Sequence, residues 1–255
     1  MQAQDFADLY ALEESYWWFV GMERVTAALL DPVCTAARAR DVLDAGCGTG
    51  AMLNWLERYA RGGRVFGIDV SPDALDFCRA RGLRNLAQAS ATALPFADES
   101  FDLVTSFDVL VQIPGEGSDE LAMREMFRVL RPGGVAFVRA AAYEWMRSGH
   151  DEALHTQRRY SLEQLTARME RAGFSVRRAT YANTLLFPVA AFRRLVLKRV
   201  GLADSGSDVK PLPPALAWLN RALTHALYAE ARLLKSPGAK LPAGLSTVCV
   251  AEKPE

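Results

Sequence analysis

Residues 41–140 alternate short apolar runs with longer helical stretches, and this alternation constrains the fold more than any other feature of the sequence. It indicates parallel strands joined by right-handed helical crossovers, so we expect an α/β fold with a doubly wound, mostly parallel sheet. The strands are predicted at residues 41–44, 64–69, 85–88, 101–106 and 135–140, and the helices at 51–60, 72–81 and 119–130.

The alternation ends after residue 140. Strands are predicted at 174–180 and 245–251, and we expect them to pair antiparallel and to complete a seven-stranded sheet. The long stretch between them carries no strand signal and is predicted to be a helical insertion. The expected organisation is an N-terminal helical cover at 1–40, a sheet domain at 41–180 and 245–255, and an insertion or cap at 181–244.

A glycine-rich turn follows the first predicted strand, with the sequence Val-Leu-Asp-Ala-Gly-Cys-Gly-Thr-Gly at residues 42–50. Glycines there let the backbone turn sharply and approach a ligand closely. Asp69 ends the second predicted strand, where a carboxylate can accept hydrogen bonds from both hydroxyls of a ribose. The pattern predicts a nucleoside-containing ligand in the crevice beyond the carboxyl ends of the strands.

The spacing of the glycines separates two classes of cofactor. A dinucleotide site has the pattern G-x-G-x-x-G, which lets a helix N-terminus hold a pyrophosphate. Here Gly46, Gly48 and Gly50 alternate with single residues, and Asp44 precedes them. Because this carboxylate repels a pyrophosphate and attracts the α-ammonium of an amino acid, the turn favours S-adenosylmethionine. A nicotinamide-dependent oxidoreductase is the less favoured alternative.

Five segments, in this order and spacing, resemble the class I S-adenosylmethionine-dependent methyltransferases, in the branch typified by small-molecule and lipid-quinone methyltransferases. They are residues 42–50, 65–71, 92–102, 107–110 and 125–134. The resemblance implies a Rossmann-like sheet, S-adenosylmethionine as cofactor and S-adenosylhomocysteine as product. It also implies methyl transfer to a small-molecule or lipid-linked acceptor, with oxygen favoured over nitrogen. A non-catalytic S-adenosylmethionine-binding or regulatory module is the alternative with the same fold.

The resemblance also implies a role for individual residues at the cofactor. Asp69 would hold the ribose, Val70 would pack on the adenine, and Phe107 would lie beside the sulfonium. Ser90 stands where many members have an aspartate that accepts the adenine amino group, and the backbone of Ala91 would read the adenine edge. The methionine part would be held by Asp44 and by the backbone of Ala45, Gly46, Cys47, Gly48 and Gly50.

Candidate catalytic and acceptor-binding residues follow the fifth predicted strand. His150, His155 and Tyr160 are the catalytic candidates, and the alternative for either histidine is an exposed loop position. Arg158 and Arg159 can bind a carboxylate or phosphate, or can form a solvated basic run. Because the histidines lack both the i,i+4 spacing and an H-E-x-x-H frame, no metal site is predicted.

Tyr16, Trp17 and Trp18 form an unusually aromatic segment before a helix predicted at 22–30. The resemblance implies that an N-terminal helix covers the cofactor and substrate cleft, with these aromatics on the acceptor and Arg24 near the cofactor carboxylate. The alternative is ordinary packing of the aromatic rings on the sheet domain.

The insertion contains helices predicted at 185–200 and 215–234, separated by a Gly/Ser/Pro-rich linker. The first helix is amphipathic and basic, which suits an anionic membrane surface or the roof of a site for a lipid-like substrate. We favour packing against the second helix, within one chain or across a homodimer, as its main role. Its apolar face is Leu185, Leu186, Phe187, Val189, Phe192, Leu195, Val196 and Val200, and its basic face is Arg193, Arg194, Lys198 and Arg199.

The charges are balanced overall, with 30 basic and 30 acidic residues, which argues against a nucleic-acid partner. Residues 1–140 nevertheless carry 20 acidic and 13 basic residues, and residues 141–255 carry 10 and 17. This asymmetry favours an acceptor of anionic character. The four scattered cysteines, Cys34, Cys47, Cys78 and Cys249, predict neither disulfides nor zinc and fit a cytoplasmic protein, peripheral to a membrane at most.

Overall fold

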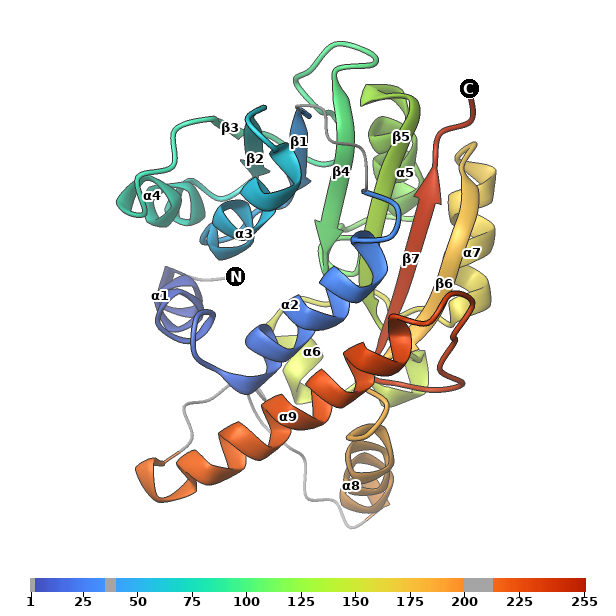
Figure 1. Ribbon diagram of the computed structural model, residues 1–255. Coiled ribbons are helices and arrows are strands. Elements are labelled where there is room, and N and C mark those ends of the chain that lie inside the picture. Colours follow the sequence, from blue (N-terminus) through green and yellow to red (C-terminus); the bar gives the residue numbers. More distant parts are fainter. Residues whose placement is uncertain (1–2, 35–39, 200–212) are drawn as a thin grey trace.

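The computed structural model describes residues 3–34, 40–199 and 213–255. Its centre is a seven-stranded sheet in the order β3-β2-β1-β4-β5-β7-β6 (Figure 1). The strands are β1 Val42–Ala45, β2 Val65–Asp69, β3 Leu86–Gln88, β4 Phe101–Phe107, β5 Leu130–Ala141, β6 Ser175–Ala182 and β7 Ser246–Glu252. The helices are α1 Ala3–Leu12, α2 Trp17–Leu30, α3 Ala51–Ala60, α4 Pro72–Ala80, α5 Ser118–Val129, α6 Gly149–Ala153, α7 Leu162–Arg171, α8 Phe187–Arg199 and α9 Ala217–Leu234, with short 3-10 turns at Glu144–Met146 and Pro214–Leu216.

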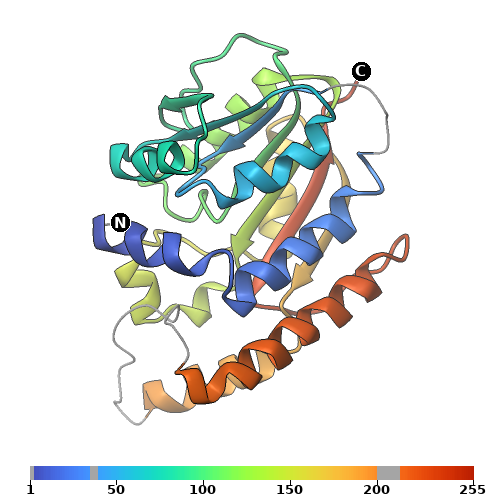
Figure 2. The same ribbon diagram turned by 60° about the vertical axis from the view of Figure 1, so that its left-hand side comes forward.

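The sheet confirms the predicted fold class. Strands β3, β2, β1, β4 and β5 are parallel, whereas β7 pairs antiparallel with both β5 and β6. Helices α5 and α7 cover one face of the sheet, and α2, α3 and α9 cover the other (Figures 1 and 2). Ser71 and Ser161 cap the starts of α4 and α7, because each hydroxyl accepts a backbone N–H of the first turn.

Two element starts differ by five residues from the sequence prediction, and other boundaries shift by one or two. Helix α2 begins at Trp17, so Trp17 and Trp18 lie inside the helix and Tyr16 directly precedes it. Both tryptophans pack against the hydrophobic cluster that α2 shares with the sheet. Strand β5 begins at Leu130 rather than at residue 135. The pairing with β4 passes from Phe101–Leu130 to Leu103–Val135, so the Pro-Gly-Gly segment at 132–134 forms a bulge within the strand.

Helix α9 lies along α2, far from it in sequence (Figure 2). Met22, Val25, Leu227 and Ala231 are buried in one shared hydrophobic cluster, so the cover and the insertion form one layer over the sheet. The packing that we expected between the two insertion helices, within one chain or across a homodimer, stays a prediction, and α9 packs on α2 as well. Residues 200–212, which include Val200 and most of the predicted linker, lie outside the described residues, as do the side chains of residues 196–199.

The close approach of α2 and α9 predicts the effect of a substitution at Gly21. A Cβ atom placed there would lie 2.6 Å from the Cβ of Leu227, so the helices must separate to accept a larger residue. We expect Gly21→Val to lower the free energy of unfolding by about 1–3 kcal/mol. Ala222→Val, at an exposed position of α9, is the control. Urea unfolding followed by circular dichroism measures both, and equal midpoints would contradict this packing.

Candidate functional site

A cavity of about 470 Å³ lies at the carboxyl ends of β1, β4 and β5. Its walls come from the glycine-rich turn, the start of α3 and the ends of β4 and β5, and α1 and α2 close it from the side. Figures 1 and 2 show these two helices lying across the end of the sheet toward which β4 points. The cavity is therefore in the crevice that the sequence predicts.

The glycine-rich turn has a conformation that requires glycine. Gly46 has φ +99°, and a Cβ atom on it would lie 2.2 Å from Cγ2 of Val109. The N–H groups of Gly46 and Cys47 both donate to the carbonyl of Ile68, at 2.9 and 2.8 Å, which ties the turn to β2. The turn is thus a rigid backbone surface that a ligand can approach closely.

Asp69 organises the edge of the crevice. Its carboxylate accepts the N–H of Gly48 at 3.0 Å and the N–H of Ser71 at 2.9 Å, which joins the turn to the start of α4. The next side chain, Val70, is 64% exposed, which is unusual for valine. A half-buried carboxylate beside an open apolar side chain suits a ribose and a flat base, as the sequence predicts.

Asp44 lies on the floor of the cavity and is only 1% exposed. Burial raises the pKa of its carboxyl to about 7, although a hydrogen bond from Thr105 and the charge of Arg139 oppose this rise. The Thr105 hydroxyl donates to Oδ1 of Asp44 at 2.8 Å. Because Thr105 and Arg139 do not offset the cost of burying the ionised Asp44 carboxylate, a cationic ligand group would be strongly favoured beside it.

At the adenine side, Ser90 and Ala91 are already ordered. The Ser90 and Thr92 hydroxyls lie 2.7 Å apart, and the Thr92 N–H donates to Oγ of Ser90 at 3.2 Å. Ala91 is buried beneath them. The roles predicted for both residues at adenine stay predictions, with the Ser90 oxygen held in place by Thr92.

The N-terminal cover is held over the turn by ion pairs that the sequence analysis missed. Glu13 accepts hydrogen bonds from the Thr49 hydroxyl at 2.5 Å and from Arg81 at 2.6 Å. Arg81 also pairs with Glu14 and donates to the carbonyl of Thr49. These contacts join three distant segments, so no local pattern in the sequence could predict them.

The three predicted aromatic residues of the cover are placed differently from one another. Trp18 packs on the guanidinium of Arg139, which lines the cavity. The N–H of Trp17 donates to Oδ1 of Asn220 on α9 at 2.9 Å, and Tyr16 is buried against neighbouring aromatic rings. Arg24, expected near the cofactor carboxylate, is exposed and lies over the ring of Tyr228 on α9.

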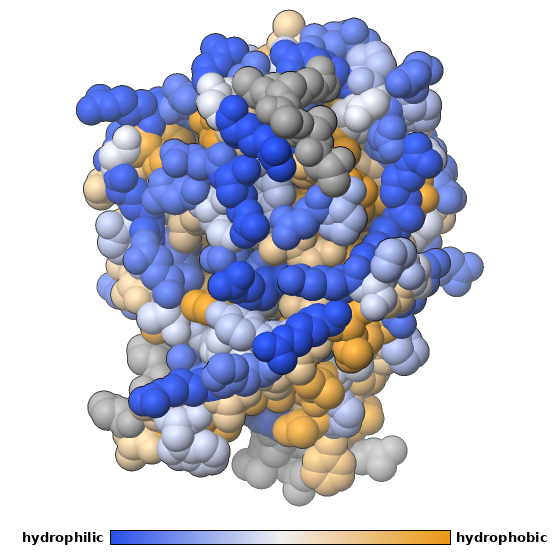
Figure 3. Space-filling view, viewed as in Figure 1, coloured by the Kyte–Doolittle hydropathy of each residue, from blue (hydrophilic) through white to orange (hydrophobic). Residues whose placement is uncertain are grey.

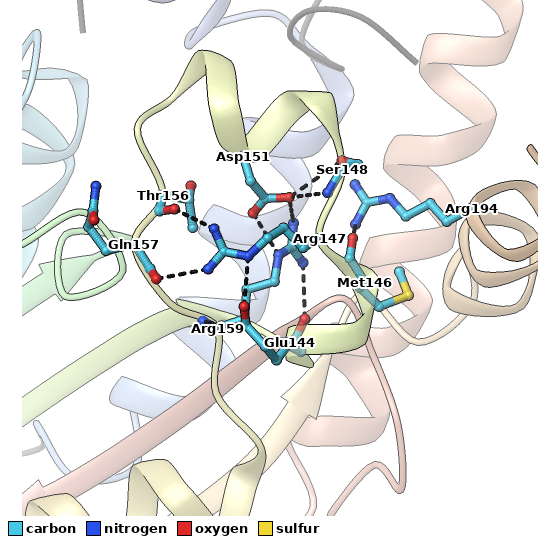
Figure 4. A network of polar contacts seen from close by, with 10 residues as sticks. Glu144, Met146, Arg147, Ser148, Asp151, Thr156, Gln157, Arg159 and Arg194 are labelled. Atoms are coloured by element: carbon cyan, nitrogen blue, oxygen red, sulfur yellow. Dashed lines mark hydrogen bonds and ion pairs between the residues drawn. The ribbon is translucent and has the colours of Figure 1, made fainter. Parts of the chain in front are cut away.

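The predicted acceptor-binding arginines have internal partners. Arg159 is buried and donates two hydrogen bonds to Asp151, at 2.7 and 3.0 Å, within the network of Figure 4. Arg158 pairs with Asp119 at 2.8 Å, and the Tyr160 hydroxyl donates to the same carboxylate at 2.6 Å. None of these three side chains is among the described residues that line the cavity.

The catalytic candidates share that segment. Burial and the adjacent Asp119 raise the pKa of Tyr160, which disfavours a role as a base. His155 is exposed, in a left-handed conformation with φ +54°, and His150 lies in α6 with a side chain outside the described residues. The catalytic roles of these three residues stay predictions without a contact to the cavity.

The described residues hold no group of three or more His, Cys, Asp and Glu side chains arranged for a metal ion. A charged cavity-lining residue that the sequence analysis did not single out is Arg139, near the end of β5. A single charge within the apolar run of residues 135–142 was the available signal.

Comparison with known proteins agrees with this geometry. Residues 43–138 match the family model described as a methyltransferase domain. A probable S-adenosylmethionine-dependent methyltransferase of Mycolicibacterium smegmatis is 33% identical over 64% of this chain and 61% of its own length. A fatty-acid O-methyltransferase of the same organism is 37% identical over 39% of this chain and 38% of its own length. The matches therefore span less than two thirds of either relative.

Solved structures support the same fold. The crystal structure of a putative methyltransferase from Bacillus halodurans superposes with a TM-score of 0.59 at 20% identity. That superposition covers 90% of this chain and 98% of the other, so the likeness extends over the cover and the insertion as well as the sheet.

Proposed function

The chain carries a class I S-adenosylmethionine-dependent methyltransferase domain, and from this premise we propose that it transfers a methyl group to an oxygen of a small-molecule or lipid-linked acceptor. The observation that carries the proposal is a pair of carboxylates on either side of the glycine-rich turn: Asp44 lines the cavity, and Asp69, outside the lining, accepts the N–H of Gly48 in that turn. Asp44 suits the α-ammonium and Asp69 the ribose of the cofactor, which satisfies both ends of one molecule.

When bound, the cofactor supplies an activated methyl group on a sulfonium, so the protein mainly has to orient the acceptor and exclude water. Asp44 and the backbone of the glycine-rich turn would hold the amino-acid part. Phe107, which lines the cavity at the end of β4, would lie beside the sulfur. Helices α1 and α2 and the turn between them would close the site, because Leu9, Phe19 and Glu13 of these three segments line it.

Oxygen is the proposed acceptor atom because a fatty-acid O-methyltransferase is among the similar proteins. A carboxylate oxygen is already ionised at neutral pH and needs no base. This fits a cavity whose described lining residues include no histidine. The runner-up functions are a cofactor-binding module without turnover and a nicotinamide-dependent oxidoreductase.

Isothermal titration and a transfer assay separate these functions. We expect the wild-type chain to bind S-adenosylhomocysteine and not NADH. Tight binding of S-adenosylhomocysteine without transfer of a labelled methyl group to any oxygen acceptor would favour the non-catalytic module. Binding of NADH in its place would favour the oxidoreductase.

The raised pKa of Asp44 predicts that cofactor affinity depends on pH. Below its pKa of about 7 the buried carboxyl is neutral, whereas a cationic ammonium binds the ionised form. We expect the affinity for S-adenosylhomocysteine to fall by up to about tenfold per pH unit as the pH drops below 7, with release of a proton on binding. The window is roughly pH 5.5–7.5, on either side of the pKa of about 7 of the Asp44 carboxyl.

Asp44→Asn is the control for this pH dependence, because an amide does not titrate. Titrations of the variant and the wild type in buffers of different ionisation enthalpy would measure the proton release directly. A wild-type affinity that stays flat across the window would place the cofactor's ammonium away from Asp44.

Helix α8 and the residues just before it present an exposed apolar surface. Val189 and Phe192 are 67% and 70% exposed, and Leu185 and Leu195 extend the same apolar surface. Figure 3 shows apolar side chains gathered toward the end of the molecule that carries α8 and α9. Exposed Arg193 lies on the same helix, so we propose contact with an anionic membrane surface. No helix among the described residues is long and apolar enough to cross a membrane.

Sedimentation with phosphatidylglycerol-containing vesicles at low salt tests this surface. We expect the wild type to co-sediment and Phe192→Ser to remain in the supernatant, with Leu121→Ser, at an exposed apolar position on α5, as control. A wild type that stays in the supernatant and runs as a dimer in size-exclusion chromatography would favour the homodimer instead.

The four cysteines are buried thiols, which supports the proposed cytoplasmic location.

A further inference from the structure

Arg139 is a buried base on the wall of the cavity, only 6% exposed. Its guanidinium lies between the rings of Trp18 and Phe107, with 4.8 and 5.1 Å from its central carbon to the two ring centroids. Its Nε donates to Oδ2 of Asp108 at 2.8 Å. Burying an arginine is unfavourable unless its donors are used, so this arrangement calls for a further partner.

The hydrogen bond to Asp108 comes from Nε of Arg139, so the two Nη groups remain available as donors. Within the described structure neither Nη group of Arg139 has a hydrogen-bond acceptor. A guanidinium with two parallel N–H groups available binds a carboxylate in bidentate fashion. The two flanking rings fix the plane of the guanidinium and limit access to the side that faces the cavity.

The position of Arg139 in the sheet indicates whether it lies on the cofactor side or the acceptor side of the cavity. Asp69, Asp44 and Phe107 lie at the ends of β2, β1 and β4, which are successive neighbours in the sheet. Under the proposed function the cofactor follows this order from ribose to sulfur. Arg139 pairs in register with Phe107 on the next strand, β5, so it lies beyond the sulfur on the acceptor side.

Arg139 forms its ion pair with Asp108, outside the cavity lining, and has no hydrogen bond to the described acidic residues that line the cavity. Glu13 and Glu14 are bound by Arg81, and burial raises the pKa of Glu23, which favours its neutral form. Asp44 would be matched by the cofactor's ammonium. Among the described residues that line the cavity, Arg139 is the one base.

We propose that Arg139 binds the carboxylate of the methyl acceptor, and that this carboxylate is the group methylated. The proposal rests on the methyltransferase function above. One carboxylate oxygen forms the bond to the methyl carbon while the carbon–sulfur bond breaks, and the electron pair of that bond stays on sulfur. The products are a neutral methyl ester and S-adenosylhomocysteine, and no proton is transferred. The apolar wall formed by Phe19, Met52 and Trp55 suits an acyl chain on the acid.

Isothermal titration with dodecanoate and with dodecanamide, each in saturating S-adenosylhomocysteine, tests the proposal. We expect the wild type to bind dodecanoate at least tenfold more tightly than the neutral amide. Arg139→Gln should weaken dodecanoate binding by roughly 10- to 100-fold, as for the loss of a charge-assisted bidentate pair, and leave S-adenosylhomocysteine binding within about twofold. Arg171→Gln makes the same change in charge at an exposed position of α7, outside the cavity lining, and should bind dodecanoate like the wild type.

Arg139→Lys covers the case in which the glutamine variant does not fold. It retains the charge beside Asp108 but not the fork, and should still lose about tenfold for dodecanoate. Equal binding of dodecanoate and dodecanamide by the wild type, or of dodecanoate by the wild type and the lysine variant, would overturn the proposal. Weakened S-adenosylhomocysteine binding in an Arg139 variant would also overturn it, since Arg139 would then hold the cofactor. Failure of the wild type to bind S-adenosylhomocysteine would instead refute the proposed function.

Discussion

Replacing Asp119 with alanine is expected to lower the free energy of unfolding by about 3 kcal/mol, because the buried Tyr160 hydroxyl and two partly buried arginines lose their shared acceptor. Asp119 lies in the first turn of α5, and its side chain is 0% exposed. It accepts the Tyr160 hydroxyl and pairs with Arg158 and Arg168. The carboxylate thus joins α5, α7 and the segment that follows β5.

The adjacent Glu120 provides the matched control, since it pairs with the more exposed Arg171. Glu120→Ala should cost less than about 1 kcal/mol. Urea unfolding of both variants measures the difference. The cofactor affinity of Asp119→Ala should match the wild type while it is folded, because Asp119 does not line the cavity. Similar unfolding midpoints for the two variants would show that the network has no structural role.

The same residue predicts a dependence of stability on pH. Burial alone would raise the pKa of Asp119, but the hydrogen bond from Tyr160 and the charges of Arg158 and Arg168 lower it below 3.8. A carboxyl whose pKa is lower in the folded state stabilises the fold above the pKa of the unfolded chain. That contribution is lost as the pH falls through the folded-state pKa. The stability difference between wild type and Asp119→Ala should therefore shrink in acid, below about pH 4.

Replacing Asp69 with alanine is expected to raise the dissociation constant for S-adenosylhomocysteine by roughly 100-fold. The substitution removes the proposed charge-assisted hydrogen bonds to the ribose, each of about 1.5–3 kcal/mol. It also removes the acceptor of the Gly48 and Ser71 N–H groups, so the turn loses its link to α4. The two losses act on the same ligand surface.

Asp73→Ala is the control for this experiment, because Asp73 is an exposed acid in the first turn of α4. It removes one negative charge near the crevice without touching the turn. Isothermal titration measures both variants, and thermal melts verify that they are folded. An unchanged affinity in Asp69→Ala would show that the ribose lies elsewhere.

The sheet, and the meeting of the glycine-rich turn with Asp69 at its edge, could be predicted because their signals are local. The glycine-rich turn, Asp44 and Asp69 each follow directly from a strand with a clear apolar run. Parallel strands bring their carboxyl ends to one edge, so the sequence placed these residues together without any knowledge of long-range contacts.

The acceptor side could not be predicted in the same way, because its residues depend on partners far away in sequence. Arg158 was predicted to bind the acceptor and Tyr160 to be catalytic, yet Asp119 on α5 engages both side chains. Arg139 is one charge within an apolar run, and its role depends on its register with Phe107. The packing of α9 on α2 depends on the close approach of Leu227 to Gly21, two residues that lie far apart in the sequence.

Titration of the wild-type chain with S-adenosylhomocysteine tests the central claim most directly. The account predicts one-to-one binding in the micromolar range that is greatly weakened in Asp69→Ala and absent for NADH. No heat of binding up to high micromolar ligand, from a chain shown to be folded, would contradict it.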